Sequence, residues 1–252
     1  MRTRSSEPCG TGAAARDAVH ASPDIHSSTA EYAARFAGAA GRWFLRVQED
    51  ATQAALAGIV PGRALDVGGC HGHNLAVLSR CGHSVTVLAS EPVCFRNLAP
   101  GAATFRVGSL IRFPFRDAAF DVVLSYRLLT HLASWRDHVA ELCRVSERTV
   151  IAEFPVRTGI YALAPRLFAA KRRIEGNTRP YAMFRETDVI AEFGRRGFVP
   201  VVRHAQYFWP MALHRLHGRL AVGVALEALP RRLGLSSRFG SPVILRFDRK
   251  RP

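Results

Sequence analysis

The stretch between residues 66 and 74 combines an acid, several glycines and two histidines in a spacing suited to ligand binding. Asp66 ends a short apolar run, and Gly68, Gly69 and Gly72 follow it within six positions. A glycine-rich turn between a strand and a helix presents backbone N–H groups to a ligand, and the missing Cβ atoms allow close approach. The stretch therefore predicts a site for a small polar or anionic cofactor.

Three histidines are candidates for proton transfer near this turn. His71 and His73 flank the last glycine, and His131 follows a later strand. Histidine is the usual general base near neutral pH for a nucleophile of moderate acidity. We take His131 as the catalytic candidate. Its alternative role is a hydrogen bond to the backbone, and the alternative for His71 and His73 is solvation or an orienting contact. No metal site is predicted, because the histidines and cysteines lack ligand spacing.

Apolar runs and helical patterns alternate along the chain and supply the elements that position these residues. The alternation predicts a parallel sheet with helices on both faces. The strands are expected at 63–67, 84–89, 104–107, 120–125, 149–154, 199–203 and 242–247, and the helices between them at 74–80, 135–145 and 187–196.

The chain is expected to form a single domain after an irregular start. Ser28 and Glu31 form a capping box that predicts a helix to about residue 53. The domain plan has four parts: a disordered segment at 1–26, a lid helix at 27–58, a cofactor-binding core at 63–154, and a substrate-side region with the final strands at 155–252.

Composition limits the cellular setting. Of the 252 residues 48% are hydrophobic, yet no stretch reaches the roughly 18 apolar residues of a membrane span. The first 30 residues lack the apolar segment of a secretory signal. The five cysteines show no C-x-x-C pair, which favours reduced thiols in a cytoplasmic protein.

The positive charge is concentrated in the last third of the chain. Residues 1–155 have a net charge of +2, whereas residues 156–252 have a net charge of +13. Basic and apolar residues alternate with helical spacing at 161–174 and again at 207–220. Such stretches can lie on an anionic bilayer or cover an acidic, apolar substrate, and the alternative is a lid helix with its arginines in water.

Motifs in a fixed order after the glycine turn narrow the choice of cofactor. The loop lacks the third position of a G-x-G-x-x-G dinucleotide motif and the Gly-Lys-Ser/Thr of a P-loop. The motifs are D-V-G-G-C-H-G at 66–72, G-S-L at 108–110, F-P-F-R-D at 113–117, F-D-V-V-L-S at 120–125 and L-L-T-H-L at 128–132. In this order they resemble the class I S-adenosylmethionine-dependent methyltransferases, and most of all the small-molecule branch that includes quinone and lipid methyltransferases.

The resemblance implies a Rossmann-like α/β fold, with a seven-stranded, mostly parallel sheet, and S-adenosyl-L-methionine as the cofactor. Three positions depart from the family pattern: Cys70 replaces a glycine, Ala89 a ribose-binding acid, and Ser109 an adenine-contacting aspartate. Glu91 is then expected to serve in place of the missing acid. The residues that the resemblance assigns to cofactor binding are Asp66, Gly68, Gly69, Gly72, Asn74, Glu91, Ser109, Leu110 and Ser125.

The resemblance also implies an enzyme that methylates a small hydrophobic or anionic acceptor, more often at oxygen. The Asp/Asn-Pro-Pro-Tyr loop of nucleobase amino-methyltransferases is missing after residue 125. An RNA methyltransferase and a non-catalytic binding module with a degenerate cofactor site stay open as alternatives. The basic last third allows a lipid-like acceptor and peripheral membrane contact, whereas nucleic acid is less favoured because no array of stacking aromatics is apparent.

Overall fold

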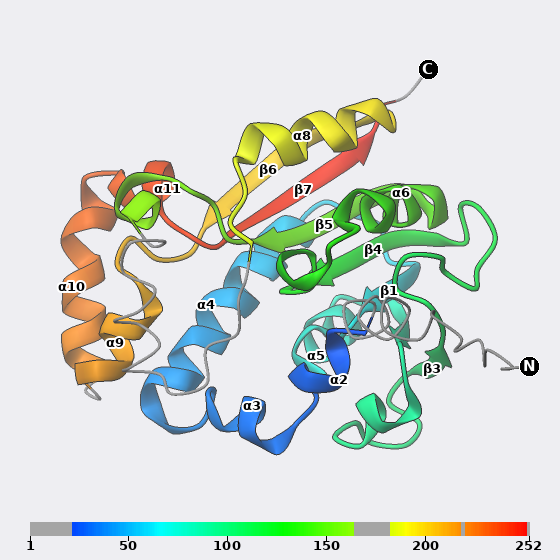
Figure 1. Cartoon of the computed structure of the whole chain (residues 1–252), viewed down its shortest axis with the longest axis horizontal. Helices are drawn as coiled ribbons and strands as arrows, with labels where there is room; N and C mark the ends of the chain where they lie inside the picture. The colour runs from blue at the N-terminus through cyan, green and yellow to red at the C-terminus, as the bar shows by residue number, and fades with distance from the viewer. Residues whose placement is uncertain (1–21, 164–181, 218–219, 251–252) are drawn as a thin grey trace, which may run out of the picture.

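A seven-stranded sheet with helices on both faces forms the centre of the protein, as the computed structural model in Figure 1 shows. The structure describes residues 22–163, 182–217 and 220–250. The strand order is β3-β2-β1-β4-β5-β7-β6. The strands are Arg63–Val67 (β1), Ser84–Ala89 (β2), Thr104–Val107 (β3), Phe120–Tyr126 (β4), Ser146–Phe154 (β5), Phe198–Ala205 (β6) and Val243–Arg249 (β7).

The sheet is parallel from β3 to β5 and antiparallel where β7 joins it. β7 pairs with β5 on one side and with β6 on the other, antiparallel to both. The expected fold, a mostly parallel seven-stranded sheet in a Rossmann-like arrangement, is therefore confirmed. Each predicted strand is present, and its ends differ from the prediction by no more than three residues.

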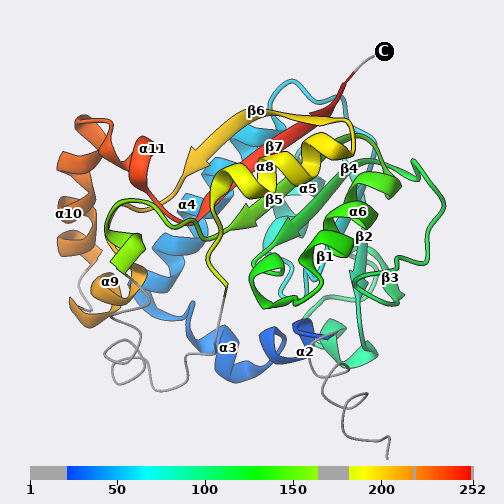
Figure 2. The ribbon, with the colours of Figure 1, turned by 45° about the horizontal axis from the view of Figure 1, so that its top comes forward.

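Two layers of helices bury the faces of the sheet, as Figure 2 shows from a second direction. On one face lie Gly38–Leu56 (α4) and His73–Arg80 (α5), and on the other lie Trp135–Val145 (α6) and Glu186–Arg195 (α8). Side chains from α6 and α8 pack with Leu65, Val123 and Phe247 in the larger core. Side chains from α4 and α5 pack with Val87 and Leu124 in the second core.

The segment before the sheet is broken into three helices, so the prediction of one lid helix across 27–58 is wrong. The helices are Asp24–Ser27 (α2), Ala30–Ala34 (α3) and α4. Thr29, and not Ser28, caps α3 by accepting a hydrogen bond from the backbone N–H of Tyr32. The chain then turns through Gly38, whose φ of 73° suits glycine and at which α4 begins.

The expected disorder of 1–26 is also wrong at its last residues. Residues 1–21 lie outside the described residues, but Asp24 begins α2 and its side chain is fully buried. The basic stretch expected at 161–174 lies largely outside the described residues as well. Across the described part of the chain, every helix is too short or too polar to cross a membrane.

The 38-residue insertion between the last two predicted strands forms a helical layer beside the sheet. It contains Met211–His217 (α9), Leu220–Arg232 (α10) and Leu235–Phe239 (α11). Tyr207 anchors this layer, because its hydroxyl donates to the backbone carbonyl of Phe44 in α4 and its ring packs edge-on against Trp43. The insertion is thus attached to the same helix that covers the sheet beside the glycine turn.

Candidate functional site

The glycine turn lies at the carboxyl end of β1 and leads directly into α5. Gly68 has a φ of 75° and continues the ladder, since its N–H donates to the carbonyl of Leu88 in β2 at 2.8 Å. Gly72, with a φ of 69°, is the N-cap of α5, and no side chain caps that helix. The first-turn N–H groups of α5 and the positive end of its dipole therefore face the space above the turn.

Asp66 lies beneath the turn as a fully buried carboxylate. Its Oδ1 accepts a hydrogen bond from Asn74 Nδ2 at 3.1 Å, whereas Oδ2 has no hydrogen-bond partner among the described residues. Gly69 lies against this carboxylate, because a Cβ at position 69 would overlap Asp66 Oδ2. A buried acceptor without a partner is costly, so this oxygen is suited to receive a donor from a bound ligand.

Burial of Asp66 predicts an unusual dependence of stability on pH. Burial raises the pKa of Asp66 from 3.8 to about 6, against the opposing effects of the Asn74 hydrogen bond and of Arg127. The folded protein thus holds this proton more tightly than the unfolded chain, and its stability falls as the pH rises from about 4 to 6, by about 3 kcal/mol.

The Asp66→Asn variant is expected to lose this cost while it keeps the hydrogen bond from Asn74. Without ligand, it should unfold at a higher temperature than the wild type above pH 6, and the difference should shrink toward pH 4. Thermal unfolding followed by circular dichroism across this pH range measures both curves. Parallel curves for the two proteins contradict the assignment of the buried charge to Asp66.

The helices α2 and α3 cover the glycine turn from the opposite side. His71 Nε2 forms a hydrogen bond with the backbone carbonyl of Ser27 in α2. The ring of Tyr32 in α3 stacks on His71 with centroids 5.7 Å apart, and Phe36 packs against His73 at 5.8 Å. An aromatic layer therefore joins the covering segment to the turn.

The two histidines of the turn are neutral at neutral pH. Burial, together with the nearby charge of Arg127, lowers the pKa of His73 to about 4. Burial also lowers the pKa of His71, against the effect of its hydrogen bond to Ser27. Neutral imidazoles can accept a proton or a hydrogen bond, so they add polar groups to the site without adding charge.

A cavity between the turn and its cover brings several of the predicted residues together. Asp66, the glycines at 68 and 69, Asn74 and His131 all line it. His131 is half-buried in the short helix η2 (Leu129–His131), which is held in place because Thr130 Oγ1 donates to the carbonyl of Ala182 at 2.6 Å. The complete lining is Pro23, Ser27, Tyr32, Asp66, Gly68, Gly69, Cys70, His71, His73, Asn74, Tyr126, Arg127, Leu128 and His131.

The structure places the other predicted cofactor residues away from this cavity. Ser125 and Leu110 are buried on either side of His138, whose pKa burial lowers to about 4. Because the neutral ring donates from Nδ1 to the Leu110 carbonyl at 2.5 Å, its Nε2 accepts from Ser125 Oγ at 2.9 Å. Ser109 and Glu91 are exposed outside the lining. Gly72 is the N-cap of α5 and does not line the cavity.

Asp24 is the residue at this edge that sequence reasoning missed. Its carboxylate accepts hydrogen bonds from the backbone N–H and the hydroxyl of Ser90, at 2.7 and 2.5 Å. Ser90 directly follows Ala89, the position where the family has an acid. Ile25 packs beside it against Ala89, Cys70 and Cys94. An acid from α2 thus stands next to the strand end that lacks one, a contact between residues 66 positions apart that no local pattern reveals.

Arg127, directly after β4, lines the cavity and has a strained backbone conformation. Its φ of 59° is unusual for a residue with a side chain. The guanidinium donates to Gln48 Oε1 at 2.6 Å, lies 3.6 Å from a carboxylate oxygen of Glu153, and lies 4.6 Å from the ring centre of Phe36. These contacts hold the strained backbone, and such strain is concentrated at functional sites.

The part of the chain that contains the turn matches the sequence model of a known family. Residues 65–150 match the sequence model of a family described as a methyltransferase domain. This range runs from β1 into β5 and includes the turn, both turn histidines and His131. A comparison with curated proteins finds no match.

Solved structures share this fold at low sequence identity. Magnesium protoporphyrin IX methyltransferase from Synechocystis PCC 6803 with bound S-adenosylmethionine is 14% identical, with a TM-score of 0.59 over 97% of this chain and all of that one. A methyltransferase from Thermotoga maritima, described as a possible histamine N-methyltransferase, is 13% identical, with a TM-score of 0.58 over 87% and 95%. A geranyl diphosphate methyltransferase is 14% identical, with a TM-score of 0.56 over 81% and 77%.

The residues of the turn fit the cofactor of this family. The glycines allow a cofactor to approach the backbone closely, and the uncapped start of α5 offers N–H donors. Asp66 Oδ2 is a buried acceptor that can receive a hydrogen bond from the cofactor. Asn74 and the neutral His73 add polar groups on the same side. The domain match over residues 65–150 and the shared fold therefore make the chain similar to S-adenosylmethionine-dependent methyltransferases.

Proposed function

We propose that the protein transfers a methyl group to an oxygen atom of a small hydrophobic or anionic acceptor, with His131 as the general base. The observation that carries this proposal is the shared cavity: the glycine turn, Asp66 and His131 line one space. S-adenosylmethionine supplies an electrophilic methyl group on a sulfonium. The protein must then orient an acceptor, remove its proton and exclude water.

Each of these tasks has a residue at the cavity. The N–H groups at the uncapped start of α5 and the Asp66 carboxylate bind and orient polar groups. In this proposal the half-buried imidazole of His131, which lines the cavity, takes a proton from an acceptor hydroxyl. The rings of Tyr32 and Phe36, packed on the turn histidines, keep water from that side. Positioning of this kind supplies most of the rate gain in a direct displacement.

The covered cavity supports a small acceptor over a nucleic acid. Pro23, Ser27 and Tyr32 from the covering segment line the cavity opposite the turn, so among the described residues it is bounded on two sides. Two of the structural neighbours are methyltransferases of small acceptors, magnesium protoporphyrin IX and geranyl diphosphate. Arg127 lines the cavity and is suited to an anionic group on the acceptor.

A panel assay tests the proposal. The purified protein is incubated with S-adenosylmethionine carrying a labelled methyl group and with hydroxylated prenyl, quinol, aromatic and carboxylate acceptors. Mass spectrometry of a labelled product then locates the methyl group. An O-methylated product formed by the wild type supports the proposal. Label that enters only RNA, or only nitrogen or carbon atoms of acceptors, contradicts it.

We propose further that the basic last third holds the enzyme at an anionic membrane surface that supplies a lipid-like acceptor. Val224, Leu229 and Leu233 expose 47%, 63% and 63% of their surfaces along α10 and just beyond it. Arg231 and Arg232 lie between the two leucines and are exposed. Apolar and cationic side chains in one segment match the interface of an anionic bilayer.

The Arg231→Ala/Arg232→Ala double variant is expected to bind anionic vesicles about 30-fold more weakly, since each arginine contributes about 1 kcal/mol near such a surface. Sedimentation with phosphatidylserine vesicles measures the binding, and phosphatidylcholine vesicles give the baseline. The matched control, Arg112→Ala/Arg116→Ala, removes equal charge from the loop before β4 and should bind like the wild type. Equal binding to both vesicle types contradicts the membrane contact.

A further inference from the structure

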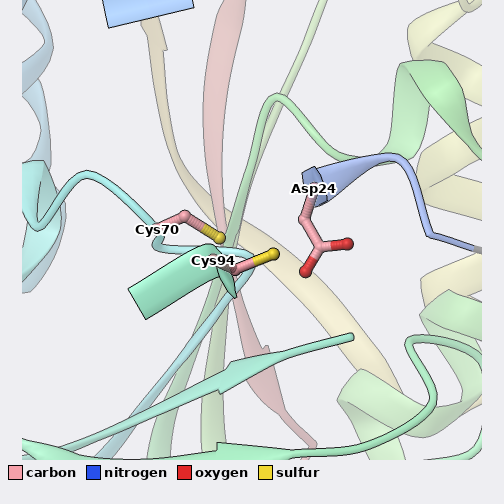
Figure 3. Close-up of side chains that lie close together, drawn as sticks. All are labelled: Asp24, Cys70 and Cys94. Carbon is pink, nitrogen blue, oxygen red and sulfur yellow. The ribbon is translucent and has the colours of Figure 1, made fainter. Parts of the chain in front are cut away.

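Three buried side chains from distant parts of the chain meet beside the glycine turn, as Figure 3 shows. They are Asp24 from α2, Cys70 from the turn, and Cys94 from the short helix η1 (Pro92–Phe95). One carboxylate oxygen and the two sulfur atoms all lie within 4.8 Å of one another. The three residues are at most 1% exposed. The cluster stands behind the cavity, and the proposed methyl transfer makes no use of Asp24 or Cys94.

Two sulfur atoms and one carboxylate form a donor set that soft and borderline divalent ions accept. Two sulfurs and a carboxylate can all become anions, and burying such groups together is unfavourable without a compensating cation. A divalent cation among the three atoms reverses this balance.

We propose that Asp24, Cys70 and Cys94 bind a zinc-class divalent ion. Sulfur donors select d¹⁰ and other soft or borderline ions over magnesium and calcium, and zinc accepts thiolate and carboxylate ligands together. Binding forms two metal–sulfur bonds and one metal–oxygen bond and releases the two thiol protons to solvent. The bound site then has one negative charge, with a fourth coordination position for water.

The surroundings of Asp24 already orient it as a ligand. The N–H and the hydroxyl of Ser90 each donate to one carboxylate oxygen, and each oxygen keeps a further lone pair for a metal. Supporting hydrogen bonds of this kind are usual around metal ligands and sharpen their geometry. The N–H of Cys94 donates to the carbonyl of Glu91 at 3.1 Å, which fixes the third ligand's backbone.

The position of the site explains two departures from the family pattern together. Cys70 stands where the family motif has a glycine, and it provides one ligand. Ala89 replaces the acid at the end of β2, and this small side chain packs between Cys70, Cys94 and Ile25. The ion joins the covering helix α2 to the turn and to η1, so it fastens the cover over the cavity.

Cobalt substitution tests the site without relying on activity. The reduced, metal-free protein is titrated with Co²⁺, and the thiolate-to-cobalt charge-transfer band is followed in the near ultraviolet. Zinc content after gel filtration gives the stoichiometry. We expect one ion per chain and a band intensity for two thiolates. Cys94→Ser should lose half of that band. Loss of a group that only hydrogen-bonds to a metal ligand weakens metal binding by about 10- to 100-fold, and Asp24→Asn, which removes a ligand, should weaken it more.

The Cys81→Ser variant is the matched control, because Cys81 is a free cysteine outside the cluster. It should bind Co²⁺ like the wild type, and circular dichroism verifies the folding of each variant. Less than one ion per chain in the reduced wild type overturns the proposal. A charge-transfer band that Cys94→Ser leaves unchanged also overturns it. The same holds if the reduced protein binds no ion and Cys70 and Cys94 form a disulfide on oxidation.

Discussion

Replacing His131 with alanine is expected to lower kcat by about 10²- to 10⁴-fold, the usual contribution of a positioned general base. The imidazole lines the cavity with the glycine turn and Asp66, on a segment anchored through Thr130 to Ala182. The Kd for S-adenosylmethionine should stay unchanged, because the turn and Asp66 are intact. The pH–rate profile of the variant should lose the limb that reports deprotonation of the base.

Steady-state kinetics with the acceptor found in the panel assay measures this effect. His83→Ala is the matched control, because His83 lies just before β2, at the amino ends of the parallel strands and away from the glycine turn. Its Nδ1 accepts a hydrogen bond from the Gly62 N–H, so its loss should lower stability and leave kcat near the wild-type value. A His131→Ala enzyme with wild-type kcat and pH profile refutes the assigned role.

Adding one methyl group at Gly69 is expected to weaken S-adenosylmethionine binding by about 10- to 100-fold. A Cβ there overlaps Asp66 Oδ2, and overpacking at a tight site costs about 1–3 kcal/mol. The backbone of Gly69 has no positive φ, so the cost comes from lost space and not from strain. Either the carboxylate or the turn must shift, and both line the cavity.

Isothermal titration calorimetry with S-adenosylmethionine and with its demethylated product measures this loss. The control is Gly194→Ala in α8, where a Cβ meets no atom within 4 Å. That variant should bind like the wild type and be more stable by about 0.5–1 kcal/mol. Unchanged affinity in Gly69→Ala means that the cofactor does not depend on the packing of the turn against Asp66.

The sheet was predictable because its strands are local apolar runs with turn signals at both ends. The segment before it was not, because the apolar spacing from Tyr32 to Val47 fits one helix as well as three. The break depends on a fold-back in which a Cβ on Gly41 would collide with the backbone of Phe36. That contact forms only in the tertiary structure.

The site was predictable in part for the same reason. The residues from Asp66 to Asn74 are adjacent in sequence, and their strand–turn–helix context fixes their geometry. Asp24 comes to the same edge through a contact across 66 residues with Ser90, and no spacing rule anticipates it. The Ser125 hydroxyl and the Leu110 carbonyl bond instead to His138, because the sequence order of a motif does not decide which groups meet in the fold. The roles assigned to the individual cofactor residues stay predictions.

Because of the place of β7, part of the sheet can form only at the end of synthesis. β7 lies between β5 and β6, although it follows both in sequence. Before residues 243–249 emerge from the ribosome, β5 has an open edge and β6 has no neighbour, and unpaired edges invite association with other chains. The cofactor half can assemble earlier, since β1 to β5 are adjacent by then. A nascent chain stalled after Phe239 should therefore have a formed glycine turn beside an exposed strand edge.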